Sequence, residues 1–219
     1  MIIVGICGGS GSGKSTFAER IRDGLSCSCE IMRLDCYYFD QGGKPFEERT
    51  KVNYDSPEIF DFDEMLADIR LLLDGKPVTR KGYNYAEHRR DDSEELMYPP
   101  EVLIIERIHV FYDDRICDIM NLKLFIKVDS DICLLRRIAR DMNERGRSLE
   151  SISEQYKATV KPMREKYIDK YIDKADVVVM RGGMNEQALK TTISYLKSCV
   201  KEQRPAESEK NESDGNDSE

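Results

Sequence analysis

The sequence predicts an α/β fold in which a five-stranded parallel sheet is flanked by helices. Five short apolar runs have the length and composition of strands that are buried on both faces; they span residues 2–7, 29–34, 101–106, 122–128 and 176–180. Segments with helical spacing fill the intervals, at residues 15–24, 62–74, 132–144 and 186–201. Such alternation gives a doubly wound sheet, with ligand sites at the carboxyl ends of the strands.

The composition limits the class of protein. The 219 residues are 40 % hydrophobic, enough for one domain, which we expect over residues 1–200. The net charge of −8 argues against a protein that mainly binds nucleic acid. No apolar segment is long enough to cross a bilayer, and the 7 scattered cysteines fit reduced thiols better than a zinc site. We therefore expect a soluble, cytoplasmic protein with no membrane or nucleic-acid partner.

Two segments fall outside this alternating pattern. Residues 75–100 contain aromatic, basic and then acidic residues before two prolines, which predicts a small hairpin or lid inserted before the third strand. Residues 201–219 carry three basic and seven acidic side chains, which predicts a disordered acidic tail.

The first apolar run leads into a glycine-rich turn and then a helix. Gly8 to Ser15 match G-x-x-x-x-G-K-[ST] in the strand–turn–helix context that this motif requires. Glycines let backbone N–H groups approach phosphate oxygens, and a helix N-terminus favours the same anion. Lys14 would reach the β- and γ-phosphates, and Ser15 would bind Mg²⁺. The predicted nucleotide-binding residues are Gly8, Gly9, Ser10, Gly11, Ser12, Gly13, Lys14, Ser15 and Thr16.

Carboxylates after the next strands favour a kinase over other phosphate-loop proteins. An N-K-x-D guanine signature is absent, which argues against a GTPase, and the third run ends in the single acid Glu106 where motors more often have Asp-Glu. We expect Glu106 beside the metal. Asp35, at the end of the second run, could accept the proton of a reacting hydroxyl or help to organise the metal.

Other residues suit a nucleoside as the second substrate. Asp55 lies in a predicted turn, where its carboxylate could hydrogen-bond a ribose diol. Tyr83, Tyr85 and His88 in the 75–100 insertion offer two aromatic faces and a polar edge for a flat base.

An arginine-rich helix follows the fourth run. Ile132, Leu135, Ala139 and Met142 predict its buried stripe. Arginine's planar fork suits phosphate, and we expect residues 136–150 to form a mobile lid that closes over the triphosphate and excludes water. The arginines of this segment are Arg136, Arg137, Arg140, Arg145 and Arg147.

Six segments together resemble the uridine-cytidine kinases over nearly the whole folded part: GGSGSGKST, LDCYYFD, NYDSPEIFDF, YNYAEHRR, VLIIE and RRIARDMNERGRS. The resemblance implies a P-loop kinase fold, commonly tetrameric, that uses Mg²⁺ to transfer the γ-phosphate of ATP or GTP to the 5′-hydroxyl of uridine or cytidine in pyrimidine salvage. It implies Asp35 as the base, with Lys14, Arg140 and Arg145 also catalytic. It further implies metal binding by Ser15 and Glu106, which Asp35 could join from its place at the strand end. The substrate-binding residues that it implies are Tyr38, Asp55, Tyr83, Tyr85, His88, Arg137 and Arg147.

Two residues depart from the family pattern. Ser56 stands where the family usually has histidine after the ribose aspartate, and Arg107 stands where it has glycine after Glu106. Arg107 could pair with Glu106 and compete with Mg²⁺, hold the γ-phosphate too tightly, or point outward; the first two would lower activity. Two alternatives stay open: a related P-loop kinase for another riboside or pantothenate, and a nucleotide-binding regulatory protein with little turnover.

Overall fold

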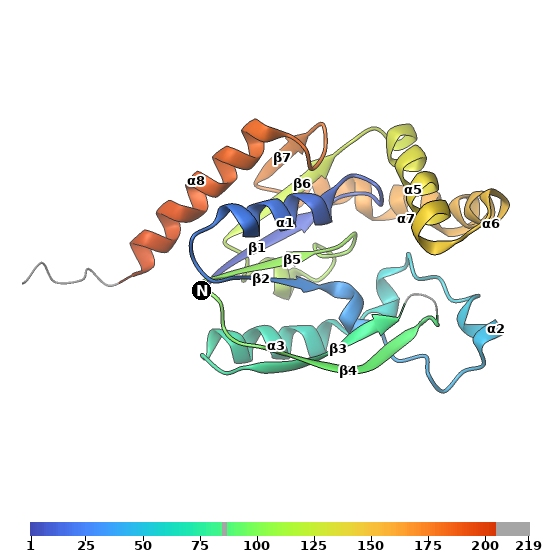
Figure 1. Ribbon diagram of the computed structural model, residues 1–219, viewed down its shortest axis with the longest axis horizontal. Coiled ribbons are helices and arrows are strands. Elements are labelled where there is room, and N and C mark those ends of the chain that lie inside the picture. Colours follow the sequence, from blue (N-terminus) through green and yellow to red (C-terminus); the bar gives the residue numbers. More distant parts are fainter. Residues whose placement is uncertain (85–86, 205–219) are drawn as a thin grey trace, which may run out of the picture.

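The structure is a computed structural model, and it describes residues 1–84 and 87–204. Its central sheet has five parallel strands in the order β2-β5-β1-β6-β7 (Figure 1). Each of the five apolar runs forms one strand, so the predicted parallel sheet is confirmed. The strands are β1 (Ile2–Cys7), β2 (Cys29–Arg33), β5 (Val102–Glu106), β6 (Leu122–Lys127) and β7 (Val177–Met180).

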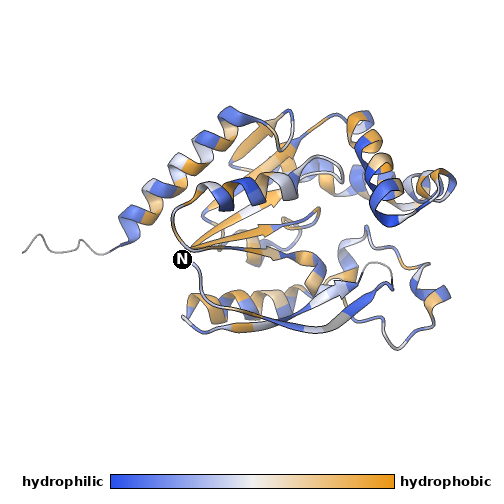
Figure 2. Cartoon of the chain, viewed as in Figure 1, coloured by the Kyte–Doolittle hydropathy of each residue, from blue (hydrophilic) through white to orange (hydrophobic). Residues whose placement is uncertain are grey.

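The sheet separates two apolar cores. Ile2, Val4 and Ile6 of β1 pack with α1 (Lys14–Gly24) and α8 (Glu186–Gln203), whereas Ile3 and Cys7 face the side that is covered by α3 (Phe62–Leu73). Successive strand residues point to opposite faces, and because helices cover both faces the strands are mainly apolar (Figure 2). The exceptions are Glu30 and Arg33 in β2, Lys123 and Lys127 in β6, and Glu106 at the end of β5.

The segment 75–100 contains an antiparallel hairpin of β3 (Val78–Asn84) and β4 (Arg89–Met97). Val78 pairs with Met97, and both side chains join the core on the α3 side of the sheet. The hairpin lies beside α3, and the ends of β3 and β4 opposite the Val78–Met97 pair lie toward α2 (Phe46–Arg49) (Figure 1).

Short helices build most of the rest of the chain. The segment from residue 149 to residue 174 is an almost continuous series of helical turns that the apolar pattern did not predict. The short elements are η1 (Leu34–Tyr37), η2 (Pro57–Ile59), α4 (Asp114–Cys117), α6 (Leu149–Gln155), the π-helical turn η3 (Tyr156–Val160), α7 (Lys161–Lys166) and η4 (Ile168–Lys174).

The buried face of helix α5 (Ser130–Arg145) is opposite to the face that the sequence predicted to be buried. The buried stripe assigned to Ile132, Leu135, Ala139 and Met142 is wrong, because all four are exposed. The buried row is Cys133, Arg137 and Asp141, spaced four residues apart on one face. That face lies against the phosphate loop and not the sheet, so its neighbours are polar. An apolar stripe predicts the inward face only when the neighbour is apolar.

The C-terminal helix extends into the segment predicted as a tail. α8 continues to Gln203, and Arg204 forms an ion pair with Glu101 at 2.8 Å. The remaining predicted tail, residues 205–219, lies outside the described residues. Over residues 1–84 and 87–204, no helix has the length and apolar character needed to cross a membrane.

Candidate active site

The phosphate loop connects β1 to α1 and is shaped by glycines with positive φ angles. Gly13, the N-cap of α1, has φ 91°. Gly11 has φ 84°, and a Cβ there would lie 2.3 Å from the carbonyl oxygen of Cys133 in α5. A side chain at Gly11 would therefore displace backbone. Lys14 is buried and donates from Nζ to the carbonyl of Gly9 at 3.0 Å, and its burial lowers the pKa of the ammonium group, an effect that Glu106 opposes.

Ser15 and Glu106 meet beside this loop. The Ser15 hydroxyl donates to Oε1 of Glu106 at 3.0 Å, and Glu106 is 2 % exposed. Oε2 of Glu106 is buried and has no hydrogen-bond partner among the described residues. A hydroxyl and a carboxylate with a spare oxygen fit Mg²⁺, which takes few protein ligands and completes its shell with phosphate and water. Among the described residues, no cluster of three or more His, Cys, Asp or Glu side chains is suited to a metal.

Asp35 lies at the same sheet edge, just after the neighbouring strand β2. Arg33 of β2 pairs in register with Glu106 of β5, and Asp35 follows two residues later in η1, where it is 3 % exposed. Arg107 lies opposite: its Nη2 is 2.5 Å from Oδ1 of Asp35 and donates to the Tyr38 hydroxyl at 3.2 Å. The sequence did not predict this contact between the unusual arginine and the predicted base.

Aromatic rings gather next to Asp35. The Tyr38 ring stacks on Phe60 at a centroid distance of 4.5 Å and lies 4.7 Å from the Tyr83 ring. Tyr54 lies 5.5 Å from Tyr38 and stacks on His88 at 5.1 Å. Burial lowers the pKa of His88, so its ring is neutral near pH 7. The hairpin thus brings Tyr83 to Tyr38 and His88 to Tyr54, while Tyr85 lies outside the described residues.

Asp55 is held from two distant parts of the chain. Its Oδ2 accepts a hydrogen bond from the Thr159 hydroxyl in η3 at 3.0 Å. Its backbone oxygen is 2.7 Å from Nε2 of His109, whose Nδ1 is 3.0 Å from the Tyr171 hydroxyl. Because a carbonyl only accepts, Nε2 carries the proton and Nδ1 accepts from Tyr171. Burial lowers the pKa of His109 to about 4, which keeps this ring neutral.

Four arginines of the predicted lid surround one buried carboxylate, Asp141, which is 0 % exposed. The nearest contact is from Arg140, at 2.8 Å from Oδ1, and the others range from 3.4 to 3.7 Å. Their common negative partner reduces the mutual repulsion of the guanidinium groups before any phosphate binds. The four arginines are Arg137, Arg140, Arg145 and Arg147.

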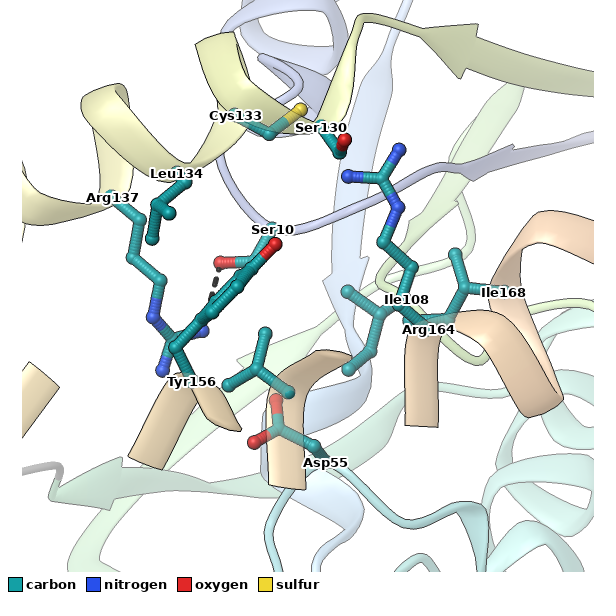
Figure 3. Close-up of a pocket in the computed structure, with 11 residues that line it drawn as sticks. Ser10, Asp55, Ile108, Ser130, Cys133, Leu134, Arg137, Tyr156, Arg164 and Ile168 are labelled. Atoms are coloured by element: carbon teal, nitrogen blue, oxygen red, sulfur yellow. Dashed lines mark hydrogen bonds between the residues drawn. The ribbon is translucent and has the colours of Figure 1, made fainter. Parts of the chain in front are cut away.

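One of these arginines connects the lid to the phosphate loop. Arg137 donates to the Ser10 hydroxyl at 3.3 Å and to the Gln155 side chain at 2.9 Å. Figure 3 shows Arg137, Ser10, Asp55 and Tyr156 around one pocket. The predicted phosphate-binding and ribose-binding residues therefore border the same pocket.

Several residues at this site were not identified from the sequence. The sequence could have identified Asp141 as a partner of the arginines, because it lies four residues from both Arg137 and Arg145 on a helix. Tyr54 adjoins Asp55 in the chain. His109 and Thr159 had no local signal, since they lie 54 and 104 residues from Asp55.

Comparisons with known proteins agree with this geometry. The model of the phosphoribulokinase / uridine kinase family matches residues 3–188. Uridine kinase of Ligilactobacillus salivarius is 41 % identical over 91 % of this chain and 94 % of its own length, and uridine kinase of Streptococcus pyogenes serotype M5 is 42 % identical over 92 % and 97 %. Among solved structures, phosphoribulokinase from Rhodobacter spheroides aligns with a TM-score of 0.61 at 14 % identity, covering 82 % of this chain and 69 % of that one, which supports the fold alone.

Proposed function

The chain belongs to the phosphoribulokinase/uridine kinase family, and from this premise we propose that it transfers the γ-phosphate of ATP or GTP to the 5′-hydroxyl of uridine or cytidine, forming UMP or CMP. The observation that carries the proposal is the single pocket that Ser10 of the phosphate loop shares with Asp55. The ribose of an acceptor bound to Asp55 would then lie beside the phosphate loop that holds the donor.

On the donor side, the phosphate loop binds the triphosphate through backbone N–H groups, and Lys14 turns from the Gly9 carbonyl to the phosphates. Ser15 and Glu106 would hold Mg²⁺, with Asp35 nearby, and the ion would neutralise charge on the transferring phosphoryl group. Ser10, Ser12 and Thr16 belong to the same proposed loop site.

On the acceptor side, Asp55 would hydrogen-bond the ribose diol, and Tyr38, Tyr83, Tyr85 and His88 would surround the base. Asp35 would accept the hydrogen of the 5′-hydroxyl and orient its oxygen for in-line attack on the γ-phosphorus. The burial of Asp35 and its place beside Tyr38 support this role.

The arginines around Asp141 complete the proposed site. Arg140 and Arg145 would stabilise negative charge on the phosphoryl group during transfer, while Arg137 and Arg147 would contact the substrates. We propose that residues 136–150 close as a lid; the hydrogen bond from Arg137 to Ser10 supports this because the segment lies beside the loop that it would cover. We also propose a cytoplasmic enzyme that assembles as a tetramer.

A substrate panel tests the function. The purified protein is given ATP or GTP with Mg²⁺ and uridine, cytidine, adenosine, nicotinamide riboside or pantothenate, and the product is identified by mass. We expect rapid formation of UMP or CMP only. Rapid turnover of another panel member would favour the related kinase, and tight triphosphate binding without any product would favour the regulatory protein.

A further inference from the structure

We propose that Arg107 is a positioning residue that holds Asp35 until the triphosphate binds, so that donor binding strengthens acceptor binding. The inference rests on the proposed function, because it assumes that Asp35 receives the 5′-hydroxyl. Family members with glycine at this position have no side chain that could make the contact.

The placement of Arg107 supports this role. Its backbone N–H donates to the carbonyl of Ile6 at 3.3 Å, which continues the β5–β1 pairing by one residue beyond Glu106. The side chain therefore begins at the sheet edge between the phosphate loop and η1. It is 25 % exposed, whereas the carboxylate of Asp35 is 4 % exposed. The guanidinium thus borders solvent, and its partner is almost completely buried.

The contact is a strong one for chemical reasons. A buried carboxylate needs a compensating charge, and the attraction between two opposite charges is strong where water is excluded. Nη2 of Arg107 satisfies this need at 2.5 Å from Oδ1. The incoming 5′-hydroxyl offers a neutral hydrogen bond to the same carboxylate, so the guanidinium is the stronger competitor.

The same guanidinium contacts a residue of the proposed base site and also acts electrostatically on the donor side. It donates to the hydroxyl of Tyr38, whose ring lies 4.7 Å from that of Tyr83. Its charge also reaches Lys14, whose pKa it helps to lower. A cation within electrostatic range of Lys14 is within range of the phosphates that Lys14 is proposed to bind.

Binding of the triphosphate therefore changes which group, Arg107 or the 5′-hydroxyl, contacts the Asp35 carboxylate. The polyanion attracts Arg107 away from Asp35, and the freed carboxylate can accept the hydrogen bond of the 5′-hydroxyl. Coupling of this kind is reciprocal, since each ligand must strengthen the other by the same factor. The loss of a hydrogen bond to a charged group corresponds to about tenfold in affinity.

The test is isothermal titration calorimetry, in which uridine is titrated into the full-length protein. The titration is done without a nucleotide and again with a saturating non-hydrolysable ATP or GTP analogue and Mg²⁺. We expect the analogue to tighten uridine binding about tenfold in the unaltered protein. In Arg107→Gly and Arg107→Gln, uridine should bind about tenfold more tightly without the analogue, which should then add less than about twofold. Arg107→Lys, which keeps the charge, should retain part of the coupling.

Two controls separate this mechanism from a structural effect. Arg115→Gln removes an exposed arginine that pairs with Asp113 and Asp63, and it should leave the coupling unchanged. In an Asp35→Asn background, Arg107→Gln should have no effect on uridine affinity, since the carboxylate that it competes for is gone.

Each outcome decides the proposal. Equal uridine affinity with and without the analogue in the unaltered protein, or coupling that survives in Arg107→Gln, would overturn it. An effect of Arg107→Gln that persists with Asp35→Asn would overturn the route through Asp35. A protein that binds neither uridine nor cytidine under any condition would overturn the proposed function itself, together with the inference that rests on it.

Discussion

The two sides of the site are built in different ways. The donor side is a local structure, in which the backbone between β1 and α1 forms the loop, and Lys14 contacts a carbonyl only five residues away. The acceptor side is assembled from side chains that meet across the chain, such as Asp55 with Thr159 and His109. Local backbone geometry withstands substitution elsewhere, whereas a site built from long-range contacts changes with each partner.

The largest effect should come from the donor side. Lys14→Ala removes the cation that is proposed to reach the β- and γ-phosphates, so kcat/KM for ATP should fall by about a thousandfold. Lys14 makes one hydrogen bond, to Gly9, and thermal unfolding should therefore change little. Steady-state kinetics and calorimetry give the two measurements, with Lys190→Ala on the exposed face of α8 as the control. Retention of more than a tenth of the activity would place the main phosphate contact elsewhere.

Asp35→Asn should give the next largest effect. The amide cannot accept a proton, so kcat should fall about a hundredfold or more. Without a donor, uridine affinity should stay within about threefold, because Arg107 already occupies the carboxylate in the ligand-free protein. Near-native kcat would show that the base is another residue.

This contrast also explains what the sequence predicted well. The five strands and the phosphate loop depend on local patterns, and both were placed correctly. The inward face of α5 was misplaced because the pattern of Leu135 and Met142 does not reveal that its neighbour is Ser10 and not an apolar sheet. Arg107 departs from the family pattern, but its partner could not be read from neighbouring residues, since Asp35 follows another strand.

The lid should show an intermediate effect. Arg140→Ala and Arg145→Ala should each lower kcat about tenfold while the fold stays intact, since both side chains are partly exposed and neither lies in an apolar core. Asp141→Asn should lower kcat to a similar extent because it releases all four arginines, but the loss of a negative charge should leave ATP affinity equal or tighter. Arg22→Ala, an exposed arginine on α1, is the matched control.

A lower melting temperature with unchanged activity per folded molecule would contradict the lid assignment. The combination of slower turnover with equal or tighter ATP binding is informative, because general destabilisation does not produce it. Inhibitor titration with a non-hydrolysable ATP analogue measures the affinity without turnover.

Stability should depend on pH through His109. Its pKa is lowered from 6.5 to about 4 in the folded protein, so the unfolded chain takes up the proton first as the pH falls. The stabilisation is complete above pH 6.5 and is lost as the pH approaches 4, by up to about 3 kcal/mol. Melting temperatures between pH 7.5 and 4.5 should fall less steeply in His109→Gln than in the unaltered protein. His88→Gln, which changes the other of the 2 histidines, should keep most of the slope.

The smallest expected effect concerns Thr159, which donates to Asp55 across 104 residues of sequence. Thr159→Val keeps the shape and removes the hydrogen bond, so Asp55 should be less well oriented for the ribose diol. KM for uridine should rise about fivefold with kcat little changed, which is the scale of one hydrogen bond. Thr159→Ser retains the hydroxyl and should behave like the unaltered protein. With 2′-deoxyuridine the penalty should shrink, because that acceptor lacks half of the diol that Asp55 is proposed to bind. If Thr159→Val lowers KM, the Thr159 hydroxyl competes with the ribose for Asp55. In that case two carboxylates of the acceptor side are occupied by the protein's own side chains before uridine binds, Asp55 by Thr159 and Asp35 by Arg107.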